Sequence, residues 1–282
     1  MKPFVTLATQ PGLLDTAWRH VSSQKGLWRP GVPISWVRLH VLRHVGLLAE
    51  ELRSGRYEPD PPRRFSIQKG DGSERPLASY YLRDRFAQRL VLLALAPRVE
   101  PILHESSYAY RPLCSSDMAV CRAREWIRRG YIWLATADIA RCFENIPHDG
   151  VLRRIADVTD LGVLEPVLRA WLGAPESHRG LPQGMVLSPL LCNLYLNSMD
   201  WAMAARDVPF VRYADDILLF ARSRGQARGA LLAAGAEAGR LGLALHPDKT
   251  TLAMSSRSLV FLGRRMPGLL EAHQDENWLE AA

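Results

Sequence analysis

Lysine is scarce in this chain of 282 residues, because only four of its 36 basic residues are lysines and the rest are arginines. A GC-rich genome is the simplest explanation of that bias. Where arginine is the default, however, a retained lysine also marks a position that needs a compact ammonium group or a tunable pKa. The candidate positions are Lys2, Lys25, Lys69 and Lys249.

Cysteine pairs, a signal peptide and long apolar runs are also missing. The four cysteines show neither CxxC spacing nor nearby paired histidines, which argues against a zinc site or a disulfide framework and suits a reducing cytoplasm. No apolar run reaches the roughly 18 residues of a membrane span. The first segment, MKPFVTLATQPGLL, has one lysine and a Pro-Gly break, unlike a secretory signal. We therefore expect a cytoplasmic protein without a membrane partner.

The composition is that of an ordinary globular protein, with 48% hydrophobic and 23% charged residues. Its length allows one large domain or two small ones. The net charge of +7 and the pI of about 9.5 favour a polyanionic partner without proving one.

Apolar spacing and turn residues predict an α+β fold. Helical spacing occurs over residues 33–55, 82–103, 115–130 and 226–242. Short strands are expected around the Gly-Asp-Gly turn of 64–77, at 131–138, on both sides of 214–216, and at 258–266. Another helix should follow Ser188 as N-cap, with Pro189 in its first turn. The order of elements after residue 130 predicts an antiparallel sheet with helices on one face.

Three acidic residues stand at the ends of apolar strands. Asp215 and Asp216 lie between two apolar runs, and Asp138 is the only acid between Tyr131 and Phe143. An Asp-Asp pair in a turn is often only a solvated turn. Apolar strands on both sides instead place this pair within a packed sheet, where adjacent acids repel each other unless a cation lies between them. Three such carboxylates could hold two Mg²⁺ ions for in-line phosphoryl transfer.

These acids lie within motifs that resemble those of reverse transcriptases. The matched segments are YADD at 213–216, TADIARCFENIPH at 136–148, GLPQGMVLSPLLCNLYL at 180–196, RFSIQKGDGSERPL at 64–77, RDRFAQ at 83–88, SYAYRP at 107–112, LGLALHPDKT at 241–250 and FLGRR at 261–265. The segment at 180–196 resembles the group II intron and bacterial version very closely. All of them follow the family's order and roughly its spacing.

The resemblance implies the fingers and palm of a right-hand polymerase, with an antiparallel palm sheet. The thumb is expected to be absent, because the chain ends about 17 residues after the last motif. Expected parts are an N-terminal extension (1–62), fingers (63–135) and a palm with the primer-grip turn (136–282), with part of 150–185 a candidate for return to the fingers. The implied activity is RNA-directed DNA synthesis from an RNA template, a DNA or RNA primer, dNTPs and two Mg²⁺ ions.

Matched positions imply roles at the metal site and at the sugar of the nucleotide. Asp138 and Asp215 would bind both metal ions. Asp216 would add a weaker contact, and the backbone carbonyl of Ile139 would complete one metal's shell. Phe143 matches the aromatic steric gate against a ribose 2′-hydroxyl, although a core phenylalanine would give the same pattern.

Other matched positions imply contacts to the incoming dNTP. Lys69 and Arg75 flank the Gly-Asp-Gly turn and would grip the triphosphate, with Arg111 supporting the same region. Taken alone, each would be a surface cation. Gln183 would pack near the nascent base pair and the template. Lys249 would protonate pyrophosphate, which arginine does badly because it cannot release a proton.

Nucleic-acid contacts are expected from two segments. Arg83, Arg85 and Arg89 would contact template phosphates. Phe261 and Gly263 belong to the turn that resembles the primer grip.

Among bacterial relatives the chain resembles CRISPR-associated reverse transcriptases most, through ENIPH and through VRYADD followed by an apolar run and Arg-Ser. This implies spacer capture from RNA, with the CRISPR integrase as a partner that supplies thumb-like contacts. The alternatives are a retron-like or other phage-defence reverse transcriptase, an untemplated or DNA-templated polymerase, and a non-catalytic nucleic-acid-binding scaffold of the same fold.

Overall fold

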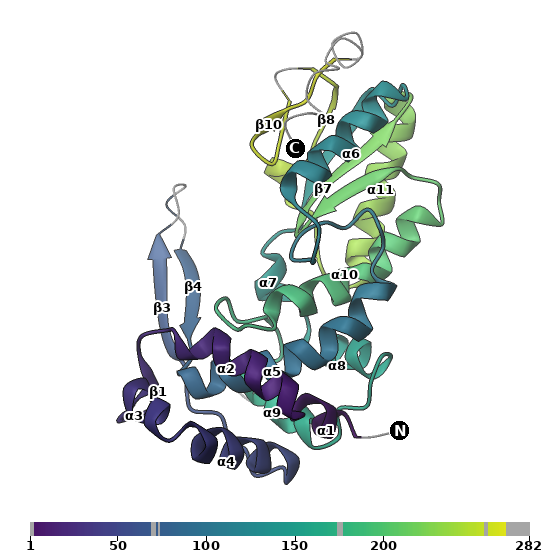
Figure 1. The fold of residues 1–282 in the computed structure, drawn as a ribbon. Helices are drawn as coiled ribbons and strands as arrows, with labels where there is room; N and C mark the ends of the chain where they lie inside the picture. The colour runs from purple at the N-terminus through teal and green to yellow at the C-terminus, as the bar shows by residue number, and fades with distance from the viewer. Residues whose placement is uncertain (1–2, 69–71, 73, 174–176, 257–258, 269–282) are drawn as a thin grey trace. The chain divides into compact units, whose positions relative to one another are not determined.

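The chain forms two compact units, each made from two separate stretches of sequence (Figure 1). The computed structural model describes residues 3–68, 72, 74–173, 177–256 and 259–268. Unit 1 comprises Met1–Ile102 with Phe143–Cys192, and unit 2 comprises Leu103–Cys142 with Asn193–Ala282. The chain thus changes unit near residues 102, 142 and 192, whereas the domain boundaries expected from sequence fall near 62 and 135. No helix within the described residues is long and apolar enough to cross a membrane.

Unit 1 is mostly helical and contains one longer β-hairpin. Its elements are α1 (Phe4–Ala8), α2 (Pro11–Ser22), β1 (Leu27–Arg29), β2 (Val32–Pro33), α3 (Ile34–Leu39), α4 (Val41–Arg53), β3 (Arg63–Gln68), β4 (Glu74–Ser79), α5 (Leu82–Val99), η1 (Glu100–Ile102), α8 (His148–Ala156), η2 (Gly162–Leu164) and α9 (Glu165–Leu172). The expected helix over 33–55 forms as two helices, because His40 leaves helical geometry between α3 and α4 (φ −129°, ψ 36°).

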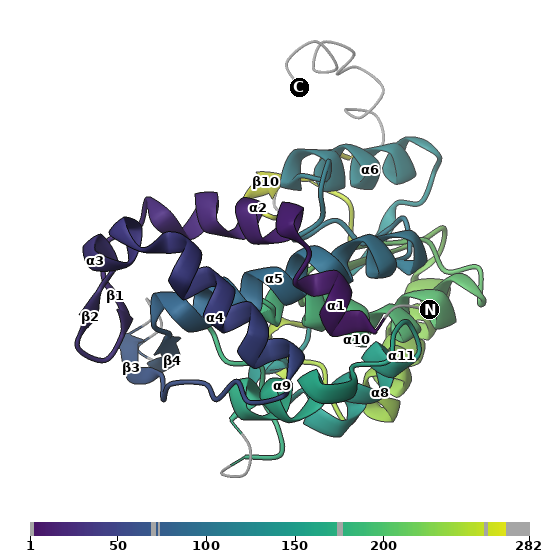
Figure 2. The same cartoon turned by 60° about the horizontal axis from the view of Figure 1, so that its bottom comes forward.

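Helix α5 is the centre of unit 1. Its apolar residues occur all round the helix rather than on one stripe, and 11 of its 18 residues are buried. Helices α1 and α2 pack against it, and Figure 2 shows them beside it. Phe86 of α5 contacts the indole of Trp28, with ring centroids 5.7 Å apart. These contacts tie the N-terminal segment into the same core as α5.

The hairpin β3–β4 is the one predicted around the Gly-Asp-Gly turn. Its register runs from Arg63↔Ser79 to Gln68↔Glu74. The backbone of the loop that precedes α10 (Ser188–Ala204) runs against β4, where the amide of Ala78 donates to the carbonyl of Gln183 at 2.8 Å. This contact fixes the loop of the GLPQG motif to the hairpin.

Unit 2 contains the main sheet. Its elements are α6 (Ser116–Arg128), β5 (Trp133–Asp138), the later part of α10, β6 (Phe210–Tyr213), β7 (Asp216–Ala221), α11 (Arg224–Arg240), η3 (Pro247–Lys249), β8 (Thr251–Met254), β9 (Val260–Phe261) and β10 (Arg264–Arg265). Helix α7 (Cys142–Asn145) begins where the chain leaves this unit. The strand order is β6-β7-β5-β8 and every pair is antiparallel.

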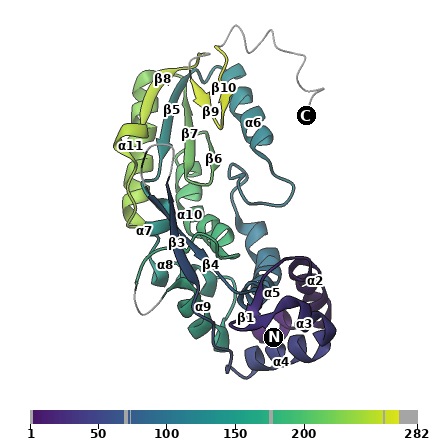
Figure 3. The ribbon, with the colours of Figure 1, turned by 90° about the vertical axis from the view of Figure 1, so that its left-hand side faces the viewer.

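Helices cover both faces of this sheet, whereas the sequence pattern predicted helices on one face. Leu218 and Phe220 pack against α6 in one buried cluster. The register partners Arg212 and Ile217 lie on the other face, where Arg212 reaches Asp200 of α10. Helix α11 packs against β5, β7 and β8, and Figure 3 shows it across the sheet from α6. The expectation failed because β7 is apolar at successive positions. Its side chains on both faces of the sheet must therefore be buried against other elements.

Candidate active site

Pairing between strands brings two of the predicted carboxylates side by side. Asp138, the last residue of β5, is the register partner of Asp216, the first residue of β7. Tyr213 of β6 pairs with Asp216 from the other side. Asp215 lies in the turn between β6 and β7, where its carbonyl accepts the amide of Ile139 at 3.3 Å. The structure thus groups Asp138, Ile139, Asp215 and Asp216 at one end of the sheet.

The turn that carries Asp215 is short and strained. Because Tyr213 pairs with Asp216, only Ala214 and Asp215 form the loop. Ala214 has a φ of 59°, in the left-handed region that two-residue hairpin turns demand and that glycine normally fills. A strained residue of this kind costs about 1–3 kcal/mol and persists only where neighbouring groups hold it.

The neighbouring carboxylates raise the proton affinity of Asp216. Partial burial, followed by the charges of Asp215 and Asp138, raises the pKa of Asp216 from 3.8 to about 6, and Lys249 opposes the shift. Asp216 is nevertheless among the solvent-exposed residues. A site of this electrostatic character favours a cation.

Lys249 supplies a cation to this cluster in the structure. The segment before it runs beside Asp138, whose carbonyl accepts the amide of His246 at 2.7 Å, and Leu245 bridges to Ile139. This places Lys249, at the end of η3, with its Nζ 3.4 Å from Oδ2 of Asp138. The lysine retained in an arginine-rich chain therefore lies at the carboxylate cluster.

The oxygen atoms at this cluster are of the type that binds magnesium, but the side chains are not yet arranged around an ion. Aspartate and carbonyl oxygens are the ligands that Mg²⁺ prefers. The described residues contain no group of three His, Cys, Asp or Glu side chains already arranged to hold an ion. The carboxylates of Asp138, Asp215 and Asp216 are therefore neighbours that an ion would have to draw together.

Three other predicted residues of unit 2 have structural contacts. Arg111 donates to the carbonyls of His104 and Ser107, at 2.8 and 2.7 Å, which supports its own segment. Phe261 is buried in the cluster with α6, and Gly263 has a φ of 75° in the turn between β9 and β10. The expected primer-grip turn is thus a real turn whose base is fixed in the core.

The remaining predicted nucleotide contacts belong to unit 1. Lys69 lies outside the described residues. Arg75 is exposed on β4 opposite Ile67. Phe143 is half-buried in α7, and its carbonyl accepts the amide of Leu181 at 2.6 Å. Gln183 is half-buried beside β4.

Arg83 corrects one expectation. The side chain of Arg83 is 7% exposed, forms an ion pair with Glu51, donates to the carbonyl of Glu58 at 2.9 Å and lies over the ring of Tyr57. It therefore stabilises unit 1 and is not placed to contact a template phosphate. The motif misled because most residues of α5 are buried, so an arginine on this helix is not necessarily at the surface.

Arg85 and Arg89, the two other arginines of this helix that were predicted to contact template phosphates, are half-buried. Arg85 lines a small cavity with Lys25 and Arg63, so three cations gather there. Arg89 contacts the ring of His20, with Nη2 2.6 Å from Nε2. Burial, followed by the charge of Arg85, lowers the pKa of Arg89.

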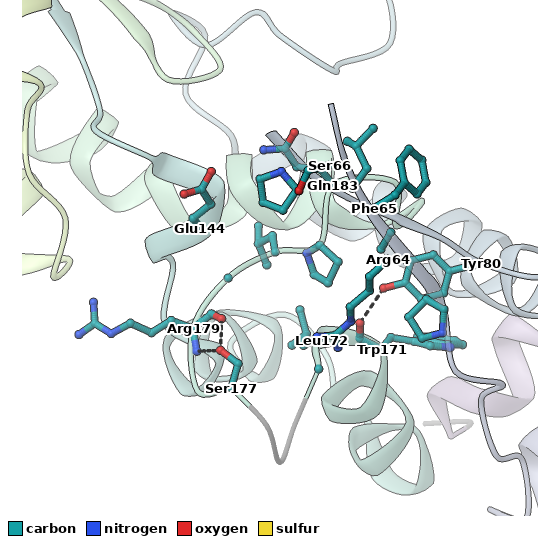
Figure 4. A pocket seen from close by; sticks show the side chains of 18 of the residues that line it. Arg64, Phe65, Ser66, Tyr80, Glu144, Trp171, Leu172, Ser177, Arg179 and Gln183 are labelled. Carbon is teal, nitrogen blue, oxygen red and sulfur yellow. Dashed lines mark hydrogen bonds between the residues drawn. The ribbon is translucent and has the colours of Figure 1, made fainter. Parts of the chain in front are cut away.

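Sequence reasoning did not foresee a cavity of about 480 Å³ in unit 1. It is lined by the hairpin β3–β4, the end of α9 and the loop of Gln183. Figure 4 shows Arg64 and Tyr80 at its wall, where the Tyr80 hydroxyl donates to the Trp171 carbonyl at 2.9 Å. The residues that line it come from segments far apart in the sequence, so no local sequence pattern predicts the cavity.

Sequence reasoning also missed a buried ion pair next to the carboxylates. Arg212 and Asp200 are both almost completely buried, with Nη2 and Oδ2 2.5 Å apart. A signal for this pair was present, because an arginine interrupts the apolar strand before the Asp-Asp pair and an aspartate interrupts the apolar face of α10.

Comparisons with known proteins agree with this architecture. The family model described as "Reverse transcriptase (RNA-dependent DNA polymerase)" matches residues 67–266. Protein YkfC of Escherichia coli (strain K12) is 31% identical over 317 residues, covering 92% of this chain and 81% of YkfC. Group II intron-encoded protein LtrA of Lactococcus lactis subsp. cremoris is 29% identical over 203 residues, covering 68% of this chain and 33% of LtrA. The chain thus spans most of one relative and a third of the other.

A solved structure of telomerase from Candida albicans has the same kind of fold. It matches 82% of this chain and 48% of the telomerase chain with a TM-score of 0.58, at 15% sequence identity. The predicted α+β polymerase fold and the predicted family are confirmed. This chain belongs to the reverse transcriptase family of RNA-directed DNA polymerases.

Proposed function

We propose that this chain extends a DNA or RNA primer on an RNA template, using two Mg²⁺ ions held by Asp138, Asp215 and Asp216. The observation that carries the proposal is the pairing of Asp138 with Asp216 across β5 and β7, with Asp215 in the adjoining turn. Three acids at adjacent strand ends are costly unless they bind cations. The ions, when bound, would acidify the primer 3′-hydroxyl and neutralise charge on the pyrophosphate.

The protein's own residues would divide the remaining work. The carbonyl of Ile139 would add an oxygen ligand beside Asp138. Lys249 would leave Asp138 when the cations bind, and would then donate a proton to the departing pyrophosphate. Its position 3.4 Å from a carboxylate oxygen supports this role, because the ammonium group already stands at the cluster.

We assign the palm to unit 2 and the fingers to the hairpin β3–β4 of unit 1. In that assignment Lys69, Arg75 and Gln183 contact the incoming nucleotide, and Phe143 excludes the 2′-hydroxyl. The membership of Phe143–Cys192 in unit 1 supports the return of part of 150–185 to the fingers. We keep the boundaries at 62 and 135 as a proposal for where the N-terminal extension, fingers and palm begin and end. They do not coincide with the two compact units.

Primer extension by the purified chain tests this function. An RNA template with a DNA primer, dNTPs and Mg²⁺ should give extended products, and a chelator should stop the reaction. Asp138→Asn should reduce the rate by at least about a thousandfold, while binding to RNA is retained. Asp15→Asn is the control, because Asp15 is an exposed acid of α2. Full activity of Asp138→Asn would show that the site is elsewhere, and an inactive wild-type chain that still binds RNA would favour a scaffold.

We further propose a role in CRISPR spacer acquisition from RNA, in the cytoplasm, with the CRISPR integrase as partner. Support comes from the sequence alone, through ENIPH and through VRYADD with its apolar run and Arg-Ser. The test is spacer acquisition in cells that carry the integrase, with and without this chain. New spacers that derive from RNA and require Asp138 support the proposal. Unchanged acquisition would favour a retron-like or other phage-defence role.

A further inference from the structure

Arg212 occupies a place where a charged side chain is expensive. It lies in the apolar strand β6, and its side chain has no exposed surface. Its register partner is Ile217, whereas Tyr213 pairs with Asp216. Since side chains alternate along a strand, Arg212 lies on the sheet face opposite Asp216. An uncompensated charge in this position would be strongly destabilising.

Helix α10 compensates that charge with two residues two turns apart. Oδ1 of Asp200 accepts from Nε of Arg212 at 2.7 Å, and Oδ2 accepts from Nη2 at 2.5 Å. Oδ1 of Asn193 accepts from Nη1 at 3.0 Å. The forked guanidinium thus has a fixed orientation beneath the sheet, which a lysine at this position could not reproduce.

The same guanidinium also holds the strained turn. Nη1 of Arg212 donates to the carbonyl of Ala214 at 2.9 Å. That carbonyl belongs to the peptide group joining Ala214 to Asp215, and Ala214 has the left-handed φ of 59°. On the far side of the turn, the carbonyl of Asp215 accepts the amide of Ile139. The peptide bonds before and after Asp215 are therefore each fixed by a hydrogen bond.

The backbone around Arg212 is equally constrained. Its amide donates to Ser106 at 2.8 Å, and its carbonyl accepts from Tyr108 at 3.0 Å. The side-chain amide of Asn193 donates to the carbonyl of Ala109 at 2.6 Å. The SYAYRP segment, α10 and the β6–β7 turn thus share one hydrogen-bonded network within unit 2.

We propose that Arg212, Asp200 and Asn193 are positioning residues that hold Asp215 and Asp216 in the arrangement needed to bind metal ions. The inference rests on the proposed metal role of those two acids. A pair of apolar side chains could fill the same volume and serve stability as well. Apolar side chains could not donate to the carbonyl of Ala214, so the ion pair is explained by what it does to the turn.

The test compares variants of the full chain for folding, Mn²⁺ binding and nucleotide addition. Arg212→Met/Asp200→Leu replaces the buried pair with apolar side chains, a change that often leaves stability intact. Glu237→Gln is the matched control, because Glu237 is a buried acid of unit 2 paired with Arg206 at 2.7 Å, but it lies on α11. Mn²⁺ affinity is measured by electron paramagnetic resonance without nucleic acid, and kcat and KM for dNTP by primer extension.

The double variant should fold, bind Mn²⁺ at least about tenfold more weakly and lose kcat by a similar factor. Its KM for dNTP should change by less than about threefold, because the change acts on the carboxylates and not on nucleotide contacts. Control-like Mn²⁺ affinity and kcat in a folded double variant would overturn the proposal.

A conservative variant keeps the test decisive if the double variant does not fold. Arg212→Lys retains the positive charge near Asp200 but lacks the fork that also reaches Ala214, so the same losses are expected in a folded protein. Wild-type behaviour of Arg212→Lys, or failure of both variants to fold, would overturn the proposal.

Asp215→Asn in the same series separates the proposed function of the carboxylates from the positioning role of Arg212. If it keeps Mn²⁺ binding and turnover, the proposed function fails. If it loses both while the Arg212 variants keep them, only the positioning role fails.

Discussion

Asp84 carries a fully buried carboxyl group in the first turn of α5. Oδ1 of Asp84 accepts from the hydroxyl of Tyr57 at 2.7 Å and from the indole of Trp171 at 3.4 Å. Burial raises its pKa from 3.8 to about 6, although both of these hydrogen bonds and the charge of Arg83 act against the shift. The carboxyl group of Asp84 therefore binds its proton more tightly in the folded protein than in the unfolded chain.

The first prediction is a pH dependence of stability from this residue. Because the pKa of Asp84 is raised in the folded state, its stabilising contribution to the free energy of unfolding is fully present below about pH 4. This contribution is lost as the pH rises through 6. The loss amounts to at most about 3 kcal/mol, since one unit of pKa corresponds to about 1.4 kcal/mol. Urea unfolding at several pH values measures it. Asp84→Asn should flatten the profile between pH 4 and 6, and the exposed control Asp15→Asn should not. An unchanged profile in Asp84→Asn would contradict the assignment.

The second prediction concerns Phe143. If its ring excludes the 2′-hydroxyl, Phe143→Ala should raise ribonucleotide incorporation relative to deoxyribonucleotide incorporation by about tenfold or more. Competition between rNTP and dNTP in primer extension gives the ratio. Phe65→Ala, which removes an exposed ring from β3, is the control. A constant ratio with normal dNTP use would leave Phe143 as a packing residue of α7.

At the scale of elements, the loop before α10 depends on one glycine. Gly184 has a φ of 111°, and a Cβ at this position would lie 2.1 Å from the carbonyl oxygen of Ala78 in β4. No side-chain rotation could relieve that clash, because the atom belongs to the backbone. The close approach allows the loop to place Gln183 against the hairpin β3–β4. A glycine in the GLPQG motif is therefore explained by packing.

The third prediction follows from this approach. Gly184→Ala should cost about 2–3 kcal/mol of folding free energy, since the strand or the loop must move and the φ is strained. Gly229→Ala is a control of opposite sign, because Gly229 lies in α11 with open space around it, and alanine there should stabilise by up to about 1 kcal/mol. Hydrogen exchange at the amide of Ala78 would report loss of its bond to Gln183. Equal stability of the two variants would contradict the packing argument.

The helices and strands were largely predictable from local sequence pattern, but which helices pack on which face of the sheet was not. The strand that ends at Asp138 follows from an apolar run with a single acid, and the strands around Asp215 follow from two apolar runs separated by an acidic pair, so the grouping of these acids could be foreseen. The second helical layer on the sheet could not, because the 115–130 helix carries no sign of which face it will cover. The burial of Arg83 also depends on Glu51, which is distant in sequence.

At the scale of the whole chain, the net charge of +7 sets an expectation for nucleic-acid binding. Phosphate contacts release counterions, so affinity should fall steeply with salt. A handful of contacts gives a log–log slope of about −4 to −6 for an RNA–DNA primer–template. Fluorescence anisotropy at several salt concentrations measures the slope. Binding that is insensitive to salt would show that arginine contacts to phosphate are not the main source of affinity.

The central claim is that Asp215 and Asp216 are ligands of the catalytic metal ions. The most direct test is single-turnover primer extension on an RNA template by the double variant Asp215→Asn/Asp216→Asn, beside wild type and the exposed-acid control Asp117→Asn. The double variant should fold and bind the primer–template with unchanged affinity, yet add no nucleotide over the time in which the control completes its reaction. Nucleotide addition by the folded double variant at the wild-type rate would contradict the account.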